Sequence, residues 1–298
     1  MVENIRAARS APLATKAMTA QPSSNLRLSE DAWPAPRSPV SAAWSDIVNG
    51  AAKSWLWMAL AFQDIKLRYR GSVLGPFWLT ITTVVMVASM GAIYSTLFDI
   101  SARDYLPYLT IGLIAWSYIS TVISDGCQTF LSAEGIIQTV PLPYSVHAYR
   151  AVFRNLIVLA HSLVIIPFAL LIFQIPVGWR ILEIVPALIL YALNGVWISV
   201  LFGMLSARYR DIPPIVANFT QVLFFVTPVI YPASLLGPWR AVADLNPAFA
   251  AIDVMRAPLL GVATSTYSWP MFLVTTAAGC LATFIIFARF RARIAYWT

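Results

Sequence analysis

Aromatic side chains are the residues in this sequence whose type best suits contact with a ligand. The chain holds 11 Trp, 12 Tyr and 16 Phe. Most of them should form interfacial belts or core packing. Aromatic faces also stack on the C–H-rich faces of sugar rings without demanding one particular sugar. We therefore predict a glycan channel lined by aromatic residues within or near apolar runs: Trp78, Tyr94, Trp116, Tyr118, Tyr191 and Trp197.

Residues typical of catalysis or metal binding are sparse. His161 lies inside an apolar run, where an interhelical hydrogen bond is a more ordinary role than a proton relay. Cys127 and Cys280 lack metal-ligand spacing and are expected to be unpaired thiols. The sequence contains no G-x-x-x-x-G-K-[S/T], G-x-S-x-G, H-E-x-x-H or C-x-x-C motif. We expect no catalytic residue, metal or cofactor in this chain.

The composition indicates that lipid is the main solvent of this protein. Apolar residues make up 59% of the 298 residues, charged residues only 11%, and the mean hydropathy is +0.72. A soluble domain is nearer to about a quarter charged. The net charge of +7 could suit nucleic acid, but the bases stand at the ends of apolar runs. This pattern is typical of membrane topology and predicts an all-α integral membrane protein that does not bind nucleic acid.

Six apolar runs are long enough to cross a bilayer, for which a helix needs about 20 residues. Their cores contain no Asp, Glu, Lys or Arg, which argues against an ion-coupled carrier and against a membrane-embedded hydrolase or transferase. Energy for any transport is therefore expected from a separate subunit. The runs, taken together as a six-span domain over residues 71–298, are 71–98, 105–124, 155–179, 184–207, 212–239 and 257–288.

The basic residues predict the orientation of these spans. With the N-terminus inside, only Arg103, Arg180, Arg240 and Arg256 fall in outer segments. Basic loops resist translocation, so both termini are expected in the cytoplasm. Residues 1–43 are rich in Pro, Ser and Ala and lack the apolar core of a signal peptide. They predict a flexible cytoplasmic tail.

Two segments on the predicted inner side could meet a soluble partner. Residues 44–70 carry apolar side chains at steps of three and four, which predicts an amphipathic helix in the membrane interface. It could be a plain lipid anchor or a docking surface. Residues 129–140 predict a short helix that Pro141 stops, either a connecting element or a place where a partner pushes. The candidate contact residues are Asp64, Lys66, Arg68, Arg70, Glu134 and Gln138.

The segment between the fifth and sixth spans predicts a helix on the outer side. Asn246 and Pro247 suit the start of a helix, and Gly261 suits its end. Asp253 and Arg256 stand three residues apart and could pair. A helix this apolar should re-enter the bilayer or pack on the bundle, where it could close an outer gate. The gate candidates are Tyr231, Asn246, Pro247, Asp253 and Arg256.

Several motifs occur in an order that resembles a known family. The stretch from Phe62 to Trp78 resembles the opening signature of type-2 ABC exporter permeases for polysaccharides, which include O-antigen (lipopolysaccharide), capsule and teichoic-acid exporters. Each further motif is weak alone, but the ordered set from residue 44 to the C-terminus is specific. These motifs are Gly112–Trp116, Ala207–Ile212, Thr227–Pro232 and Leu245–Pro247, followed by Arg256.

The resemblance implies a homodimeric permease served by two copies of a cytoplasmic ABC ATPase subunit. It further implies an interface helix, six spans and outer gate helices in each protomer, with ATP and magnesium held by the partner ATPase. The expected function is ATP-driven export of a lipid-linked polysaccharide, such as O-antigen, across the inner membrane. Two alternatives stay open: a type-2 ABC exporter of drugs or lipids, and a membrane scaffold for glycan assembly that transports nothing.

Overall fold

The computed structural model describes residues 38–75, 77–176 and 178–298, and this part of the chain is helical with no β-strand. The predicted tail over 1–43 falls largely outside the described residues, although α1 already begins at Pro39. The α-helices are α1 (Pro39–Ala52), α2 (Ser54–Arg68), α3 (Phe77–Leu97), α4 (Ala102–Gln128), α5 (Glu134–Thr139), α6 (Ser145–Leu163), α7 (Ile165–Ile172), α8 (Ile184–Arg208), α9 (Ile212–Val226), α10 (Arg240–Asp244), α11 (Pro247–Leu259), α12 (Ser268–Phe290) and α13 (Ile294–Trp297). The short 3-10 turns are η2 (Leu131–Ala133), η3 (Trp179–Glu183), η4 (Ala233–Trp239) and η5 (Arg291–Arg293).

Within the described residues, 5 helical segments are long and apolar enough to cross a membrane. The fifth expected span, residues 212–239, contains only the 15-residue helix α9. At 1.5 Å per residue such a helix covers about 22 Å, less than the hydrocarbon core of about 30 Å. The chain leaves the helix at Thr227, just before Pro228. The membrane-length segments are Thr80–Leu97, Ala102–Gln128, Ser145–Ile172, Trp179–Arg208 and Ser268–Trp297.

Helix boundaries differ from the predicted ones wherever charges or a loop interrupt the apolar pattern. The third long segment begins at Ser145, whereas the span was expected from residue 155. The expected sixth span over 257–288 is divided, because α11 ends at Leu259 and α12 starts only at Ser268. Gly261, with φ of +70°, makes the turn between them, as expected for a glycine after a helix.

A carboxylate from another helix explains why α6 starts where it does. Asp46 of α1, whose side chain is fully buried, accepts hydrogen bonds from the backbone N–H of Tyr144 at 3.2 Å and of Ser145 at 3.0 Å. These first N–H groups have no partner within a helix, and a negative charge favours this end of the helix dipole. Arg291 donates from Nε to the same carboxylate at 2.6 Å. The contact therefore joins α1, α6 and the C-terminal segment.

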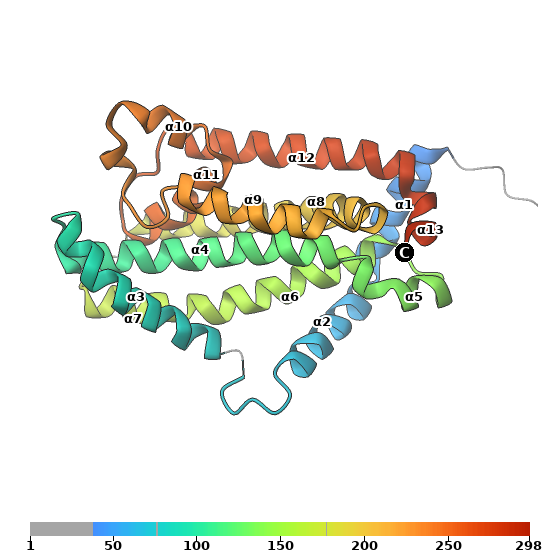
Figure 1. Ribbon diagram of the computed structural model, residues 1–298, viewed down its shortest axis with the longest axis horizontal. Helices are drawn as coiled ribbons and strands as arrows, with labels where there is room; N and C mark the ends of the chain where they lie inside the picture. The colour runs from blue at the N-terminus through green and yellow to red at the C-terminus, as the bar shows by residue number, and fades with distance from the viewer. Residues whose placement is uncertain (1–37, 76, 177) are drawn as a thin grey trace, which may run out of the picture. The chain divides into compact units, whose positions relative to one another are not determined.

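Helix α4 lies at the centre of the bundle and packs against α3, α6, α8, α9 and α11. In Figure 1, helices α4, α6, α8, α9 and α12 run along one direction, with α1, α5 and α13 gathered at one end and α10 at the other. We call these the α5 end and the α10 end. The largest fully buried core side chains include Tyr105, Leu109 and Ile114 of α4, Tyr191 of α8, and Met255 of α11.

The predicted interface helix is two helices rather than one. Lys53 separates α1 from α2, and the single helix expected over residues 44–70 therefore needs correction. The face of α2 that packs against α6 carries Trp57, whose ring centroid lies 5.3 Å from that of Phe153. Trp55 and Phe62, from the apolar stripe of the prediction, are exposed. Contact of this exposed stripe with lipid stays a prediction.

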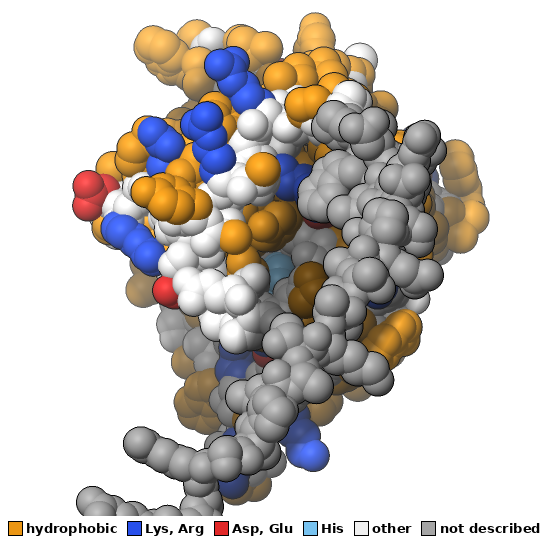
Figure 2. Space-filling view, turned by 90° about the vertical axis from the view of Figure 1, so that its right-hand side faces the viewer, with side chains coloured by type: hydrophobic (Ala, Val, Ile, Leu, Met, Phe, Trp, Pro, Cys, Tyr) orange, Lys and Arg blue, Asp and Glu red, His pale blue; other side chains and the backbone are white. Residues whose placement is uncertain are grey.

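Basic residues lie at both ends of the bundle. Figure 2 looks at the α5 end, where Lys and Arg side chains stand among apolar ones. At this end lie Arg208 and the basic residues at the end of α12 and in η5, from Arg289 to Arg293. The α10 end carries Arg103, Arg180, Arg240 and Arg256, the residues predicted for outer segments.

Candidate transport site

The segment that follows α9 is held in place by two tyrosines of α4. The hydroxyl of Tyr105 donates to the backbone oxygen of Ile230 at 3.0 Å, and that of Tyr108 donates to the backbone oxygen of Tyr231 at 3.1 Å. The hydroxyl of Tyr231 itself donates to the backbone oxygen of Phe225 at 3.1 Å. The first two bonds satisfy backbone carbonyls of a segment that lacks regular structure, and the third satisfies a carbonyl in the last turn of α9.

Arg256 fixes the same segment from α11. It is 3% exposed, and its Nη1 and Nη2 donate to the backbone oxygens of Pro228 at 3.2 Å and Val229 at 2.9 Å. Its guanidinium carbon lies 3.7 Å from the ring centroid of Tyr108, a cation–π contact. Gly112 leaves the room for this arrangement, because a Cβ at Gly112 would clash with Nη2 of Arg256.

The predicted ion pair between Asp253 and Arg256 is wrong. The Oδ2 of Asp253 instead accepts from the backbone N–H of Ser265 at 2.8 Å and from the hydroxyl of Ser268 at 2.6 Å. Asp253 thus ties α11 to the loop before α12. Arg256 points the other way, toward backbone carbonyls, because the loop after α9 offers several acceptors that the sequence pattern does not display.

The predicted start of α11 is confirmed. The side-chain oxygen of Asn246 accepts from the backbone N–H groups of Ala248 at 2.9 Å and Phe249 at 3.4 Å, and Pro247 occupies the first turn. This is the arrangement expected of an Asn cap followed by Pro. The amide nitrogen of Asn246 also donates to the hydroxyl of Thr227 at 2.9 Å. The gate function of these residues stays a prediction.

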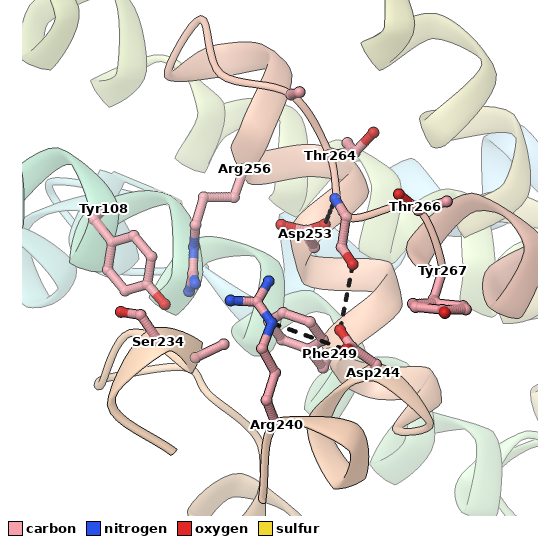
Figure 3. Close-up of a pocket in the computed structure, with 13 residues that line it drawn as sticks. Tyr108, Ser234, Arg240, Asp244, Phe249, Asp253, Arg256, Thr264, Thr266 and Tyr267 are labelled. Carbon is pink, nitrogen blue, oxygen red and sulfur yellow. Dashed lines mark hydrogen bonds and ion pairs between the residues drawn. The ribbon is translucent and has the colours of Figure 1, made fainter. Parts of the chain in front are cut away.

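A polar cavity of about 540 Å³ opens at the α10 end, and we call it the Arg240 cavity. Figure 3 shows Arg240 between Tyr108 on one side and Tyr267 on the other. The Nε of Arg240 lies 3.9 Å from Oδ2 of Asp244, too far for a tight hydrogen bond. The lining residues are Tyr108, Ala233, Ser234, Arg240, Asp244, Phe249, Asp253, Arg256, Ala263, Thr264, Ser265, Thr266 and Tyr267.

Two of the predicted channel aromatics lie in the interior of the helix bundle. The Tyr118 hydroxyl donates to the backbone oxygen of Tyr191 at 3.2 Å, and the Tyr191 hydroxyl donates to that of Ala251 at 2.9 Å. Both rings are buried, with centroids 5.2 Å apart. Together with Trp197 they line an apolar cavity of about 150 Å³. In this arrangement they stabilise the contact between α4, α8 and α11.

The other channel candidates are dispersed. Trp116 is 9% exposed and lies 5.3 Å from Phe224, measured between ring centroids. Tyr94 stacks on Phe98 at 5.5 Å, and Trp78 is exposed on α3. The structure therefore brings three of the six candidates to one cavity, and a channel function for any of them stays a prediction.

The exposed face of α4 is polar, and the predicted aromatic channel did not include its residues. Around this face the rest of α4 is largely buried. The residues recur at steps of three and four, so they lie along one side of the helix over about 17 Å. This spacing is visible in the sequence and could have revealed them. We call this set the polar stripe: Ser117, Ser120, Thr121, Ser124 and Gln128.

All residues of the polar stripe except Ser117 form one wall of a groove of about 370 Å³ between α4 and α9. From α4 it is lined by Ser120, Thr121, Ser124, Asp125, Cys127 and Gln128, and from α9 by Pro213, Val216, Ala217 and Thr220. We call it the polar groove. An exposed hydroxyl face is unusual for a helix of membrane length, because such residues normally face a bundle interior or a water-filled path. The groove can offer water and hydroxyl compounds both donors and acceptors.

An ion-pair network joins the helix before the first span to two long helices. Asp64 of α2 accepts from Arg150 of α6, with Nε at 2.8 Å and a second contact from Nη2, and from Arg154 at 2.8 Å. Arg154 also donates to Asp125 of α4 at 2.7 Å, and Arg68 approaches Asp125 at 3.9 Å. The sequence offered no direct signal for these partners, which lie up to 90 residues apart.

The network also determines how Asp64 titrates. Burial alone would raise the pKa of this carboxyl, but the hydrogen bonds and positive charges of Arg150 and Arg154 hold the pKa below its usual value of 3.8. Asp64 is therefore a carboxylate at neutral pH. Its side chain is 14% exposed and faces α6 rather than solvent.

The remaining contact candidates lie on accessible surfaces. Lys66 and Arg70 are exposed at the end of α2, and Gln138 is exposed on α5. Glu134 is half-buried at the start of α5, which ends before Pro141 as predicted. The helix expected over 129–140 is shorter than predicted, because the 3-10 turn η2 precedes α5. The structure thus leaves most of this set open to a partner but turns Asp64 inward. Contact of these residues with an ATPase stays a prediction.

Histidine and cysteine play structural parts here. The Nδ1 of His161 lies 2.7 Å from the backbone oxygen of Ile157 in the same helix, so the predicted interhelical hydrogen bond is wrong. Its ring packs edge-on against Phe77. Cys127 and Cys280 are free thiols, as predicted. Among the described residues, no three His, Cys, Asp or Glu side chains gather where they could hold a metal ion.

Comparison with known families decides the class of this fold. The family model described as "ABC-2 type transporter" matches residues 56–260. The chain belongs to the ABC-2 type transporter family. It is therefore a multi-pass membrane protein and a permease subunit, and the family implies a membrane setting and a partner ATPase.

Two relatives of this chain are O-antigen export permeases. The chain is 27% identical over 188 residues to the O-antigen export system permease protein RfbA of Myxococcus xanthus, covering 61% of this chain and 70% of that protein. It is 22% identical over 189 residues to the protein of the same name from Klebsiella pneumoniae, with the same coverage of 61% and 70%.

Proposed function

We propose that this protein is the permease subunit of an ATP-driven exporter that moves a lipid-linked polysaccharide, such as O-antigen, across the inner membrane. The names of the Myxococcus and Klebsiella relatives support the substrate class. The permease contributes the path, while two copies of a cytoplasmic ABC ATPase subunit bind ATP and magnesium and supply the energy.

The polar stripe of α4 is the observation that carries this proposal. A glycan must cross the membrane while its hydroxyls stay hydrogen-bonded, because an unsatisfied hydroxyl in hydrocarbon costs several kcal/mol. Ser117, Thr121 and Ser124 present hydroxyls on the exposed side of a membrane-length helix. Neutral hydroxyls make weak, repeated contacts that let a polymer slide. The carboxylate of Asp125 also lines the groove, and its ion pair with Arg154 at 2.7 Å offsets its charge.

The shape of this wall supports a homodimer. In one protomer the polar groove is an open furrow between α4 and α9, with one side uncovered. In lipid, the exposed hydroxyl of Ser124 on that side would lack a partner, whereas Ser120 and Thr220 donate to backbone oxygens of their own helices. Two copies that face each other across their grooves enclose a hydrated path, so we propose that the functional unit contains two permease chains.

The proposed topology has six spans and both termini in the cytoplasm. The segment from α9 through η4, residues 212–239, forms the fifth span together with its partly non-helical continuation. The α5 end then faces the cytoplasm, with α2 in the interface, and the α10 end with α11 forms the outer gate. The basic cluster of η5 and the preceding end of α12 at the α5 end supports this orientation.

Export of a lipid or drug is the second candidate. An apolar cavity of about 400 Å³ between α3, α4 and α7 favours it, because its lining, including Val84, Leu106 and Phe168, suits an acyl chain. On our account this cavity holds membrane lipid beside the permease. A substrate that lacks sugar would leave the polar stripe without a function.

Deletion and complementation test the proposal. The deletion strain should lose its surface polysaccharide and accumulate the lipid-linked form inside the cell, and the wild-type gene should restore export. Quantitative glycan immunoblots of intact and lysed cells measure both pools. Unchanged surface glycan in the deletion strain, together with an altered lipid profile, would favour the second candidate.

A further inference from the structure

The Arg240 cavity has a chemistry that the transport path does not need. Four charged side chains line it, Arg240 and Arg256 against Asp244 and Asp253, so its formal charges cancel. This balance disfavours an anion such as phosphate and equally disfavours a metal cation. The polar lining disfavours an acyl chain. What remains is a neutral ligand that both donates and accepts hydrogen bonds.

The pair formed by Arg240 and Asp244 is spaced for such a ligand. The two side chains approach only to 3.9 Å, and half of the Arg240 side chain is exposed. One oxygen of Asp244 accepts from the hydroxyl of Ser265 at 3.3 Å, and Ser265 is anchored through its backbone N–H to Asp253. The Asp244 carboxylate is therefore fixed, while Arg240 is free to move toward a ligand. Adjacent hydroxyls of a sugar can accept from the guanidinium and donate to the carboxylate together.

An aromatic platform completes the site. Tyr267 is 63% exposed at the rim of the cavity, on the side opposite Tyr108. An exposed Tyr ring beside paired charges offers an apolar face to the C–H side of a sugar ring and a hydroxyl to its rim. The cavity volume of about 540 Å³ lies within the range of small-ligand sites, which is about 300–1,000 Å³.

We propose that the Arg240 cavity is a carbohydrate-binding site that holds one or two sugar units of the exported glycan as the chain emerges. This inference rests on the proposed function, which puts the α10 end outside. Because α11 and the segment after α9 both border the cavity, a bound sugar contacts the elements that form the outer gate. Occupancy would bias export toward the outer side by holding the emerged chain against backward sliding.

Photocrosslinking in cells that make the polysaccharide tests the site. Tyr267 is replaced by p-benzoylphenylalanine in the full-length permease, co-expressed with its ATPase. The matched control places the same residue at Trp239, which is 71% exposed on the neighbouring turn and does not line the cavity. We expect a glycan-positive permease adduct at least fivefold stronger from position 267 than from position 239. The adduct should vanish in a strain that cannot make the glycan.

An export assay provides a second readout. Arg240→Ala and Asp244→Ala should each reduce surface glycan per membrane-inserted permease about threefold to tenfold, whereas Arg180→Ala, outside the cavity, should not reduce it. Equal crosslinking at positions 267 and 239, with normal export by both variants, would overturn the inference while leaving the proposed function intact. If wild-type permease itself fails to restore surface glycan to the deletion strain, the proposed function fails and the inference falls with it.

Discussion

At the scale of single residues, Gly112 determines whether Arg256 can reach the loop after α9. A methyl group at Gly112 would occupy the space of the Arg256 guanidinium, which donates to Pro228 and Val229. Hydrogen bonds from a charged group contribute about 1.5–3 kcal/mol each when buried. Gly112→Ala should therefore lower the free energy of unfolding by about 2 kcal/mol or more.

Thermal unfolding of the purified permease in detergent measures this effect. Gly135→Ala is the matched control, because a Cβ at Gly135 in α5 would meet no atom within 4 Å. Alanine is better than glycine in a helix by about 1 kcal/mol, so the control should be neutral or stabilising. Equal melting temperatures for the two variants would contradict the role of Gly112.

Asp64 makes a residue-scale prediction about pH. Its pKa is lowered in the folded protein, so its ion pairs stabilise the fold above the unfolded pKa and this contribution is lost as pH falls through the folded pKa, below 3.8. Asp64→Asn should cost about 1–3 kcal/mol at neutral pH. The difference in melting temperature from wild type should stay constant between pH 7 and 5 and shrink below pH 4. A melting-temperature difference between variant and wild type that grows as the pH falls would contradict this prediction.

At the scale of elements, we propose that a soluble ATPase contacts α5 and the end of α2. In a background without native cysteines, Gln138→Cys and Lys66→Cys should crosslink to a co-expressed ATPase, because both side chains are exposed at the proposed cytoplasmic side. Asp64→Cys should crosslink weakly, since Asp64 faces α6. Ser234→Cys at the α10 end is the negative control. Crosslinks from Ser234 alone would reverse the proposed orientation.

Local signals predicted the elements whose determinants lie close together in the sequence. The start of α11 was predictable because Asn246 and Pro247 are adjacent, and the end of α5 because Pro141 follows it. The start of α6 was missed because its charges, Arg150 among them, are matched by Asp64, 86 residues earlier. Pairing between residues this far apart leaves no periodic pattern in the sequence. A span predicted from charge-free runs therefore starts too late.

In the candidate site, too, features with local sequence signals were predictable and features that depend on distant residues were not. The polar stripe was predictable in principle, because Ser117, Thr121 and Ser124 repeat at helical spacing. The burial of Tyr118 and Tyr191 was not, since residue type alone does not say which face of a span is covered. The direction of Arg256 also depends on carbonyls of a loop whose shape no short motif encodes.

At the scale of the whole molecule, the number of spans is testable. The part of the chain that the structure describes contains 5 helical segments of membrane length, and the proposal adds residues 212–239 as a further crossing. Reporter fusions after Thr298 should be active in the cytoplasm, and fusions within 234–243 should be active in the periplasm. A periplasmic C-terminus would mean an odd number of crossings and would remove the basis for calling the α10 end outer.

The central claim is that glycan passes along the polar stripe of α4, and the most direct test is surface glycan per membrane-inserted permease. The test variant is Ser117→Leu/Ser124→Leu. The control is Ser89→Leu, which replaces an exposed hydroxyl on α3, whose exposed surface is mostly apolar. We predict at least a tenfold loss of surface glycan for the double variant at normal membrane levels, and export near wild type for the control. Export near wild type from both variants would contradict the claim.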